Sequence, residues 1–154
     1  MAASKQRPAE TTTDFAEIVK RLTAVLKPHA GRLREEATPG RYALFAKTDL
    51  SRGRPFYIAW LEARKRYVSL HLMPVYFDPG LMSGASPALK KRKHGKACFN
   101  FTSIDAELER DVSAFVAYVM DALPEEKLQS IAAGTVERER AVKERAKARA
   151  KTSR

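Results

Sequence analysis

The sequence predicts an α+β fold, a two-layer sandwich in which an antiparallel sheet of about four strands is backed by N-terminal and C-terminal helices. Apolar residues recur at helical spacing in two long segments, and short strand-like apolar runs lie between these segments. Helix and strand runs are therefore segregated rather than alternating. With 154 residues and 44% hydrophobic residues, the chain can form a single core.

Composition divides the chain into three segments. We expect residues 1–13 to be disordered, residues 14–134 to form the α+β domain, and residues 135–154 to be a basic tail, either helical or disordered. Val136 and Val142 are the only sizeable apolar residues of the tail. The tail therefore has little surface to bury against the domain.

The first helix is predicted to begin at Asp14, which forms a capping box with Glu17. Its apolar stripe consists of Phe15, Ile18, Val19, Leu22, Val25 and Leu26. Pro28 and Gly31 end this helix. The short apolar segment 41–47 is predicted to be the first strand, with no clear choice of facing.

Residues 56–73, FYIAWLEARKRYVSLHLM, are predicted to form a β-hairpin that supplies the second and third strands. A three-residue loop at 63–65 places the even-numbered residues on one face, including Trp60. We expect both helices to cover this face. The odd-numbered residues form the other face, where Tyr57 is expected to lie opposite His71.

Segment 74–96 contains too many Pro and Gly residues for regular structure throughout, although its apolar residues should pack onto the domain. Within it, Ser86, Pro87 and Gly95 are typical of the N-cap, N1 and C′ positions of a short helix of about two turns. Residues 97–102 are predicted to form the fourth strand.

The second long helix is expected over residues 105–123, because its apolar residues fall on one stripe: Leu108, Val112, Phe115, Val116, Val119, Met120 and Leu123. Pro124 ends this helix. A short amphipathic helix is then expected to end at Gly134.

Three motifs carry a family resemblance. The segments 66–76 (RYVSLHLMPVY), 86–92 (SPALKKR) and 95–101 (GKACFNF) resemble the core of the YdhG-like domain family, small bacterial proteins of unknown function, over residues 14–123. The resemblance implies a sheet backed by two helices, similar in plan to frataxin, and brings no established catalytic residues. Some relatives are regarded as frataxin-like iron chaperones, which makes iron handling one functional alternative.

The polar face of the predicted sheet is the candidate ligand-binding site, and its members are Tyr57, Tyr67, Ser69, His71, Cys98 and Asn100. Aromatic rings there provide apolar area, and the polar groups provide direction. In an alternative interpretation, segment 74–96 folds over this face, and His71 and Asn100 satisfy buried backbone groups of that segment.

These residues do not form a catalytic set. Ser69 and His71 have no carboxylate on the same face, and the chain has no Gly-x-Ser-x-Gly elbow. His71 and Cys98 are two potential metal ligands, but without a CxxC or HxxxH spacing they do not define a metal site. We therefore expect a non-enzymatic protein with neither a metal site nor a cofactor.

The formal net charge of +11 is concentrated locally, and the sharpest cluster within the domain gives the candidate phosphate-binding residues Lys90, Lys91, Arg92, Lys93 and Lys96. Aromatic residues do not alternate with these cations, so we expect weak, nonspecific contact with nucleic acid. Alternatively, the cations only face the negative end of the short helix.

Several absences predict a cytoplasmic protein without a membrane span. The N-terminal residues lack the apolar core of a signal peptide, Cys98 is the only cysteine, and apolar runs of about five residues are far below the roughly 20 of a membrane helix. The expected function is binding of a small ligand or a protein partner on the sheet face opposite the helices. The alternatives are a nucleic-acid-associated protein that contacts phosphates and a frataxin-like iron chaperone.

Overall fold

The structure, a computed structural model, describes residues 12–47, 53–122 and 124–152. Most of the N-terminal segment expected to be disordered, residues 1–11 of 1–13, lies outside the described residues. Thr12 is already part of the fold, because it exchanges backbone hydrogen bonds of 2.9 and 3.0 Å with Ile104.

The fold is α+β, as predicted, but the antiparallel sheet has six strands rather than about four, in the order β1-β2-β3-β4-β6-β5. The strands are β1 (Arg34–Thr38), β2 (Arg41–Phe45), β3 (Tyr57–Ala63), β4 (Val68–Leu72), β5 (Lys93–His94) and β6 (Cys98–Phe101). The two strands that sequence reasoning missed, β1 and β5, are the edges of the sheet. Both are polar and have no buried residue, so neither has the apolar alternation by which a half-buried strand is recognised.

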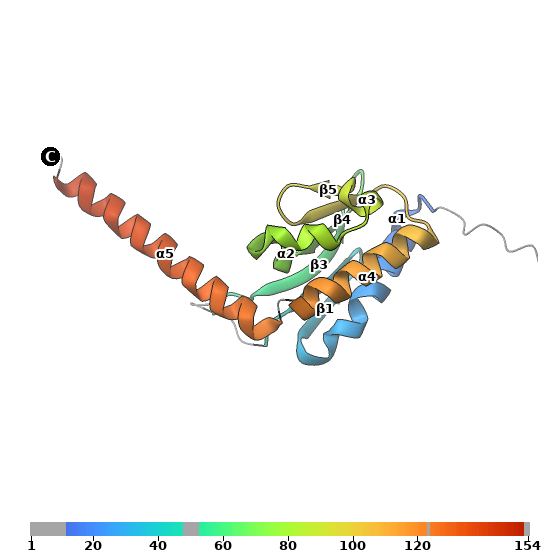
Figure 1. Ribbon diagram of the computed structural model, residues 1–154, viewed down its shortest axis with the longest axis horizontal. Helices are drawn as coiled ribbons and strands as arrows, with labels where there is room; N and C mark the ends of the chain where they lie inside the picture. Colours follow the sequence, from blue (N-terminus) through green and yellow to red (C-terminus); the bar gives the residue numbers. More distant parts are fainter. Residues whose placement is uncertain (1–11, 48–52, 123, 153–154) are drawn as a thin grey trace, which may run out of the picture.

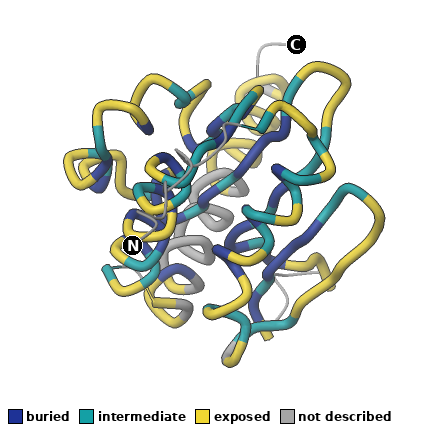
Figure 2. Tube along the Cα trace, turned by 90° about the vertical axis from the view of Figure 1, so that its right-hand side faces the viewer, coloured by how far each residue is buried: buried dark blue, intermediate teal, exposed yellow. Residues whose placement is uncertain are grey.

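Helices cover one face of this sheet (Figure 1). The elements are α1 (Phe15–Leu26), the 3-10 helix η1 (Lys27–Arg32), α2 (Met73–Phe77), the 3-10 helix η3 (Pro79–Gly84), α3 (Pro87–Lys90), α4 (Ala106–Ala122) and α5 (Glu125–Thr152). Helices α1 and α4 pack against each other, and α1 also contacts β2, β3 and β4. Figure 2 shows the buried residues gathered between these layers.

The two long helices form where their apolar stripes predict them. At the start of α1, the Asp14 carboxylate accepts a 3.1 Å hydrogen bond from the Ala16 N–H, and at the start of α4 the Asp105 carboxylate accepts a 2.8 Å bond from the Leu108 N–H. These caps satisfy backbone donors that a helix leaves unpaired at its first turn. The stripes of α1 and α4 then join the main core with the inward side chains of the sheet.

Segment 74–96 packs on the helix side of the sheet. Its residues Val75, Leu81 and Leu89 belong to the main core, and α2, η3 and α3 all contact α4. The alternative in which this segment covers the polar face is therefore wrong. Ser86 is the N-cap of α3 with Pro87 after it, as predicted.

The end of this short helix was predicted incorrectly. Helix α3 ends at Lys90, and Gly95, with a φ of 73°, lies in the turn between β5 and β6 rather than at a C′ position. Both a helix end and a tight strand turn favour glycine at positive φ. The pattern Ser-Pro followed by Gly therefore did not distinguish the two.

The predicted register of the β3–β4 hairpin is wrong. Trp60 pairs with His71 and Leu61 pairs with Leu70, whereas a loop at 63–65 would pair Tyr57 with His71. The turn is tighter, because the Arg64 N–H donates a 2.7 Å hydrogen bond to the Tyr67 carbonyl. In this register Ala59 and Leu61 of β3 and the even-numbered residues of β4 face the helices, so Trp60 is not a core residue.

A β-bulge in β3 changes which residues face the core. Leu44 pairs with Ala59, but the next residue, Phe45, pairs with Tyr57, so Ile58 is an extra residue in β3. Ile58 and Ala59 are both buried, at 1% and 0% exposure. Tyr57 consequently lies on the same face as Trp60, although the two are three positions apart.

Helix α5 continues through Gly134, so its predicted end at that glycine is wrong. Leu128, near its start, is buried with Ala46, Phe56 and Ile58 in a second apolar cluster. Residues 141–151 are all exposed, and Figure 1 shows this part of the helix extending away from the sheet and the other helices.

The register predicts a difference between neighbouring variants in β3. Leu61→Ala should lower the free energy of unfolding by about 2–5 kcal/mol, because it removes a fully buried side chain. Trp60→Ala should cost only about 1–2 kcal/mol, since Trp60 lies on the outer face and loses mainly ring contacts. Urea denaturation followed by circular dichroism measures both, and the reverse order would contradict the register.

Candidate functional site

The candidate site is the sheet face opposite α1 and α4, which we call the open face. One row of directly paired residues crosses this face through all six strands: Glu36, Ala43, Trp60, His71, Cys98 and His94. Antiparallel pairing brings such residues to the same face at adjacent positions. The row therefore joins side chains that are far apart in the sequence.

Aromatic rings form a continuous group on the open face. The rings of Trp60 and His71 stack with centroids 4.5 Å apart and an interplanar angle of 8°. Tyr57 lies 5.6 Å from Trp60, and Phe45 lies 5.6 Å from Tyr57. All four side chains keep intermediate exposure. We call these four residues the aromatic group.

Two arginines lie against the aromatic group. The guanidinium carbon of Arg34 is 4.6 Å from the centre of the Phe45 ring, and that of Arg41 is 5.4 Å from the centre of the Tyr57 ring. Arg34 Nε also donates a 2.9 Å hydrogen bond to the Ala46 carbonyl, which orients its guanidinium. Arg41 forms a 3.2 Å ion pair with Glu36. Positive charge is thus held next to the rings.

A series of polar contacts holds the His71 ring beside Trp60. His71 Nδ1 lies 2.8 Å from Cys98 Sγ, and His71 Nε2 lies 3.2 Å from Ser69 Oγ. Ser69 Oγ in turn donates to the Glu62 carbonyl at 3.4 Å. Each polar group in this series has a partner when the Cys98 thiol donates to His71 Nδ1 and the His71 Nε2–H donates to Ser69 Oγ. The tautomer of His71 is assigned from these contacts.

The pKa values of both titratable side chains in this series of contacts, His71 and Cys98, are shifted in the direction that favours the neutral forms. Burial lowers the pKa of His71, and nearby Arg64 lowers it further against the opposing effect of Glu62. Burial also raises the pKa of the Cys98 thiol. Nucleophilic attack requires the thiolate, which this environment disfavours. The arrangement fixes the position of the imidazole rather than activating the sulfur.

The sequence placed four of its six candidate residues correctly relative to one another. Ser69 pairs with Asn100 and His71 pairs with Cys98, so β4 and β6 bring these four side chains to the open face. Tyr57 also lies there, because of the bulge rather than the predicted register. Tyr67 lies outside β4, in the turn opposite Arg64.

Sequence reasoning missed several prominent members of the open face: Phe45, Trp60, Arg34 and Arg41. Trp60 was assigned to the core because the predicted loop at 63–65 placed the even-numbered residues on the helix side, and Phe45 belongs to a strand whose facing was ambiguous. The neighbouring apolar residues Ala59 and Leu61 permitted the opposite facing of β3 equally well. No signal in the chain marked the bulge.

The candidate phosphate-binding residues surround β5 at one edge of the sheet. Lys90, Lys91 and Lys96 are exposed, and the Arg92 carbonyl accepts a 2.8 Å hydrogen bond from the Asn100 N–H. Lys93 Nζ donates to the Gly95 carbonyl at 2.7 Å. Lys96 Nζ lies 5.6 Å from the centre of the Tyr76 ring. Lys93 pairs with Phe99, which faces the core, and both α3 and α2 contact α4, so the cluster lies at the β5 edge toward the helix side of the sheet.

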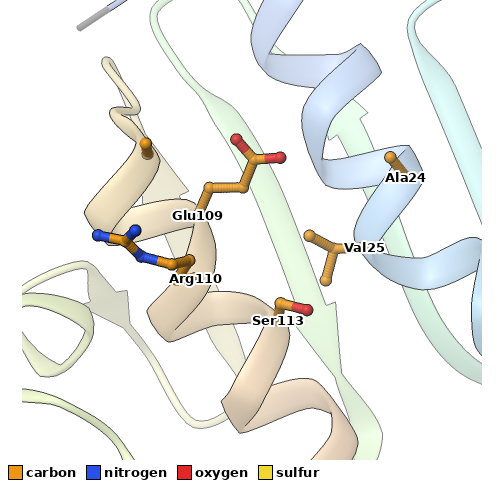
Figure 3. Close-up of a pocket in the computed structure, with 6 residues that line it drawn as sticks. Ala24, Val25, Glu109, Arg110 and Ser113 are labelled. Atoms are coloured by element: carbon orange, nitrogen blue, oxygen red, sulfur yellow. The ribbon is translucent and has the colours of Figure 1, made fainter. Parts of the chain in front are cut away.

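A separate hollow of about 310 Å³ lies between α1 and α4, lined by Ala24, Val25, Ala106, Glu109, Arg110 and Ser113 (Figure 3). Glu109 also forms a 3.7 Å ion pair with Arg21 of α1. This hollow belongs to the helix layer, so it is not part of the open face.

The part of the chain that the structure describes contains no group of three or more His, Cys, Asp or Glu side chains placed to hold a metal ion. Among the described helices, none combines the length and apolar composition needed to cross a membrane. No protein-family model, curated protein or solved structure matches this chain significantly. The YdhG-like resemblance therefore stays a prediction.

The lowered pKa of His71 predicts how stability depends on pH. A histidine whose pKa is lowered by folding stabilises the protein fully above its unfolded value of 6.5, and this contribution is lost as the pH falls through the folded value. The free energy of unfolding should therefore fall more between pH 7.5 and pH 5.5 in the wild type than in His71→Gln. His94→Gln is the control, and equal losses in wild type and His71→Gln would contradict the argument.

Proposed function

We propose that the protein is a non-enzymatic binding protein that holds single-stranded nucleic acid on the open face. The observation that supports this most directly is the aromatic group with Arg34 and Arg41 against its rings, on a sheet face that α1 to α4 leave uncovered. Partly exposed aromatic rings on a sheet provide stacking surfaces for bases, and neighbouring cations attract the phosphates.

The extent of the aromatic group favours a polymer over a small molecule, because small-molecule sites are concave and bury most of their ligand. The aromatic group extends over the neighbouring strands β2, β3 and β4, which at about 4.8 Å per strand gives a surface roughly 10 Å wide. Such a surface has room for more than one base.

Charge supports the same choice of ligand. The whole chain carries a formal net charge of +11, and a polyanion gains from contact with several cations at once. Arg34 and Arg41 lie at one side of the sheet, and the exposed Lys90, Lys91 and Lys96 lie near its other edge. A strand laid across the open face would meet Arg34 and Arg41 directly, and it would meet these lysines only by continuing around the β5 edge toward α3.

The chain has one tryptophan, Trp60, so its fluorescence reports directly on the open face. A mixed-sequence single-stranded oligonucleotide of about 12 nucleotides should quench this fluorescence as a base stacks beside the ring. Phe45→Ala and Tyr57→Ala should each weaken the binding about 5-fold or more, since stacking contributes about 1–3 kcal/mol for each base.

Tyr118→Ala is the matched control, because Tyr118 is 44% exposed on α4, on the helix side of the sheet. It should leave the affinity unchanged. Polyphosphate tests the role of the bases, because it is a polyanion without them, and it should not quench Trp60. Equal quenching by polyphosphate, or unchanged affinity in Phe45→Ala and Tyr57→Ala, would contradict the proposal and favour a protein partner for this face.

A further inference from the structure

The distal part of α5 has a structure and charge that the open face does not explain. Helix α5 is 28 residues long, and its start is attached to the domain through Leu128. From residue 141 to residue 151 every side chain is exposed, and this part extends away from the body (Figure 1). We call residues 141–152 the arm.

The arm carries its cations in a regular pattern. Lysine or arginine occupies every second position, at Lys143, Arg145, Lys147, Arg149 and Lys151, and Glu144 is the single acidic residue. Each residue advances about 100° around the helix axis, so two residues that are two positions apart are separated by about 200°. Successive cations therefore alternate between opposite sides of the helix. The lysines then form one row along the helix and the arginines form a second row on the other side.

We infer that the arm binds the major groove of duplex DNA, with one row of cations against each of the two phosphate backbones. A helix of about 10–12 Å diameter fits a groove about 12 Å wide, and the backbones border the groove on both sides of the helix. The arm is about 18 Å long at 1.5 Å per residue. Alanine occupies most positions between the rows, so the helix can lie close to the base edges.

The composition of the arm distinguishes this partner from a protein. A helix that docks into a protein groove presents an apolar row at positions three and four apart. Among the exposed residues of the arm, Val142 is the sole large apolar side chain, and it is 65% exposed. Contacts between cations and phosphates carry no sequence information, so binding should be nonspecific. The inference stands apart from single-strand binding on the open face, because different residues carry it.

The experiment uses the full chain and a fluorescein-labelled 20-base-pair duplex, with fluorescence anisotropy measured from about 50 to 300 mM salt. Each phosphate contact contributes about −0.9 to the slope of log K against log salt, so the arm should contribute about −4.5. The triple variant Lys143→Gln, Lys147→Gln, Lys151→Gln should flatten the slope by about 2.7. Arg145→Gln with Arg149→Gln should flatten it by about 1.8.

The matched control replaces three exposed lysines of the domain, Lys20→Gln, Lys27→Gln and Lys65→Gln, and so removes the same charge as the triple arm variant. The control should leave the slope nearly unchanged, and an equal loss would show that only net charge matters. If one row alone affects binding, the arm lies along one backbone and the groove geometry is wrong.

Trp60 separates this inference from the proposed function. Duplex binding through the arm should leave Trp60 fluorescence unchanged, and the triple lysine variant should retain quenching by single-stranded oligonucleotide. Duplex binding that quenches Trp60, and that survives loss of both rows, would place the duplex on the open face and overturn the inference. Circular dichroism checks that the glutamine variants keep their helical content.

Discussion

The open face depends on one extra residue in β3. Because Ile58 is inserted between the pairs of Leu44 and Phe45, two successive residues, Ile58 and Ala59, both turn toward the helices. Tyr57 and Trp60 therefore both turn outward. A regular strand would alternate strictly and send Tyr57 inward, which would separate the rings that now contact one another. The bulge thus places Ile58 in the second apolar cluster and Tyr57 in the aromatic group.

The hairpin register adds the remaining part of the surface. Trp60 can stack on His71 only because the two are directly opposite in the β3–β4 pair. The contacts of His71 with Cys98 and Ser69 fix both nitrogens of the imidazole, and burial lowers its pKa and so favours the neutral form. A neutral imidazole needs no counterion, so these contacts can satisfy it fully. The Cys98 thiol and the Ser69 hydroxyl therefore orient the His71 ring within the aromatic group.

The molecule separates its apolar, aromatic and basic surfaces. Apolar side chains of α1, α4 and the 74–96 segment meet one face of the sheet and form the main core, while the aromatic group occupies the other face. Besides Arg34 and Arg41 on the aromatic group, basic residues cluster around β5 and along the arm. Leu128 attaches the start of α5 to the domain, and residues 141–151 are exposed, so the charge of the arm extends well beyond the domain (Figure 1). In the two proposals made above, single-stranded and duplex nucleic acid contact different parts of the molecule.

The sequence by itself determined the fold class, the positions and inward stripes of α1 and α4, the N-caps Asp14 and Ser86, and the facing of β4 and β6. Each of these depends on a local signal: a period of 3.6 or 2, or a side chain that can accept a backbone hydrogen bond. The polar group Ser69, His71, Cys98 and Asn100 followed from the same alternation once β4 and β6 were neighbours.

Only the tertiary structure decided the facing of Trp60 and Tyr57, the two edge strands and the course of α5. Both sets of alternating residues in β3 include apolar side chains, so periodicity alone could not choose between the two registers. That choice depends on a tight turn after Ala63 and on the bulge at Ile58, and both are set by pairing with other strands. Strands β1 and β5 form because they pair with β2 and β6, and not because of an apolar pattern of their own. Backbone hydrogen bonds to an adjacent strand require no particular side chain.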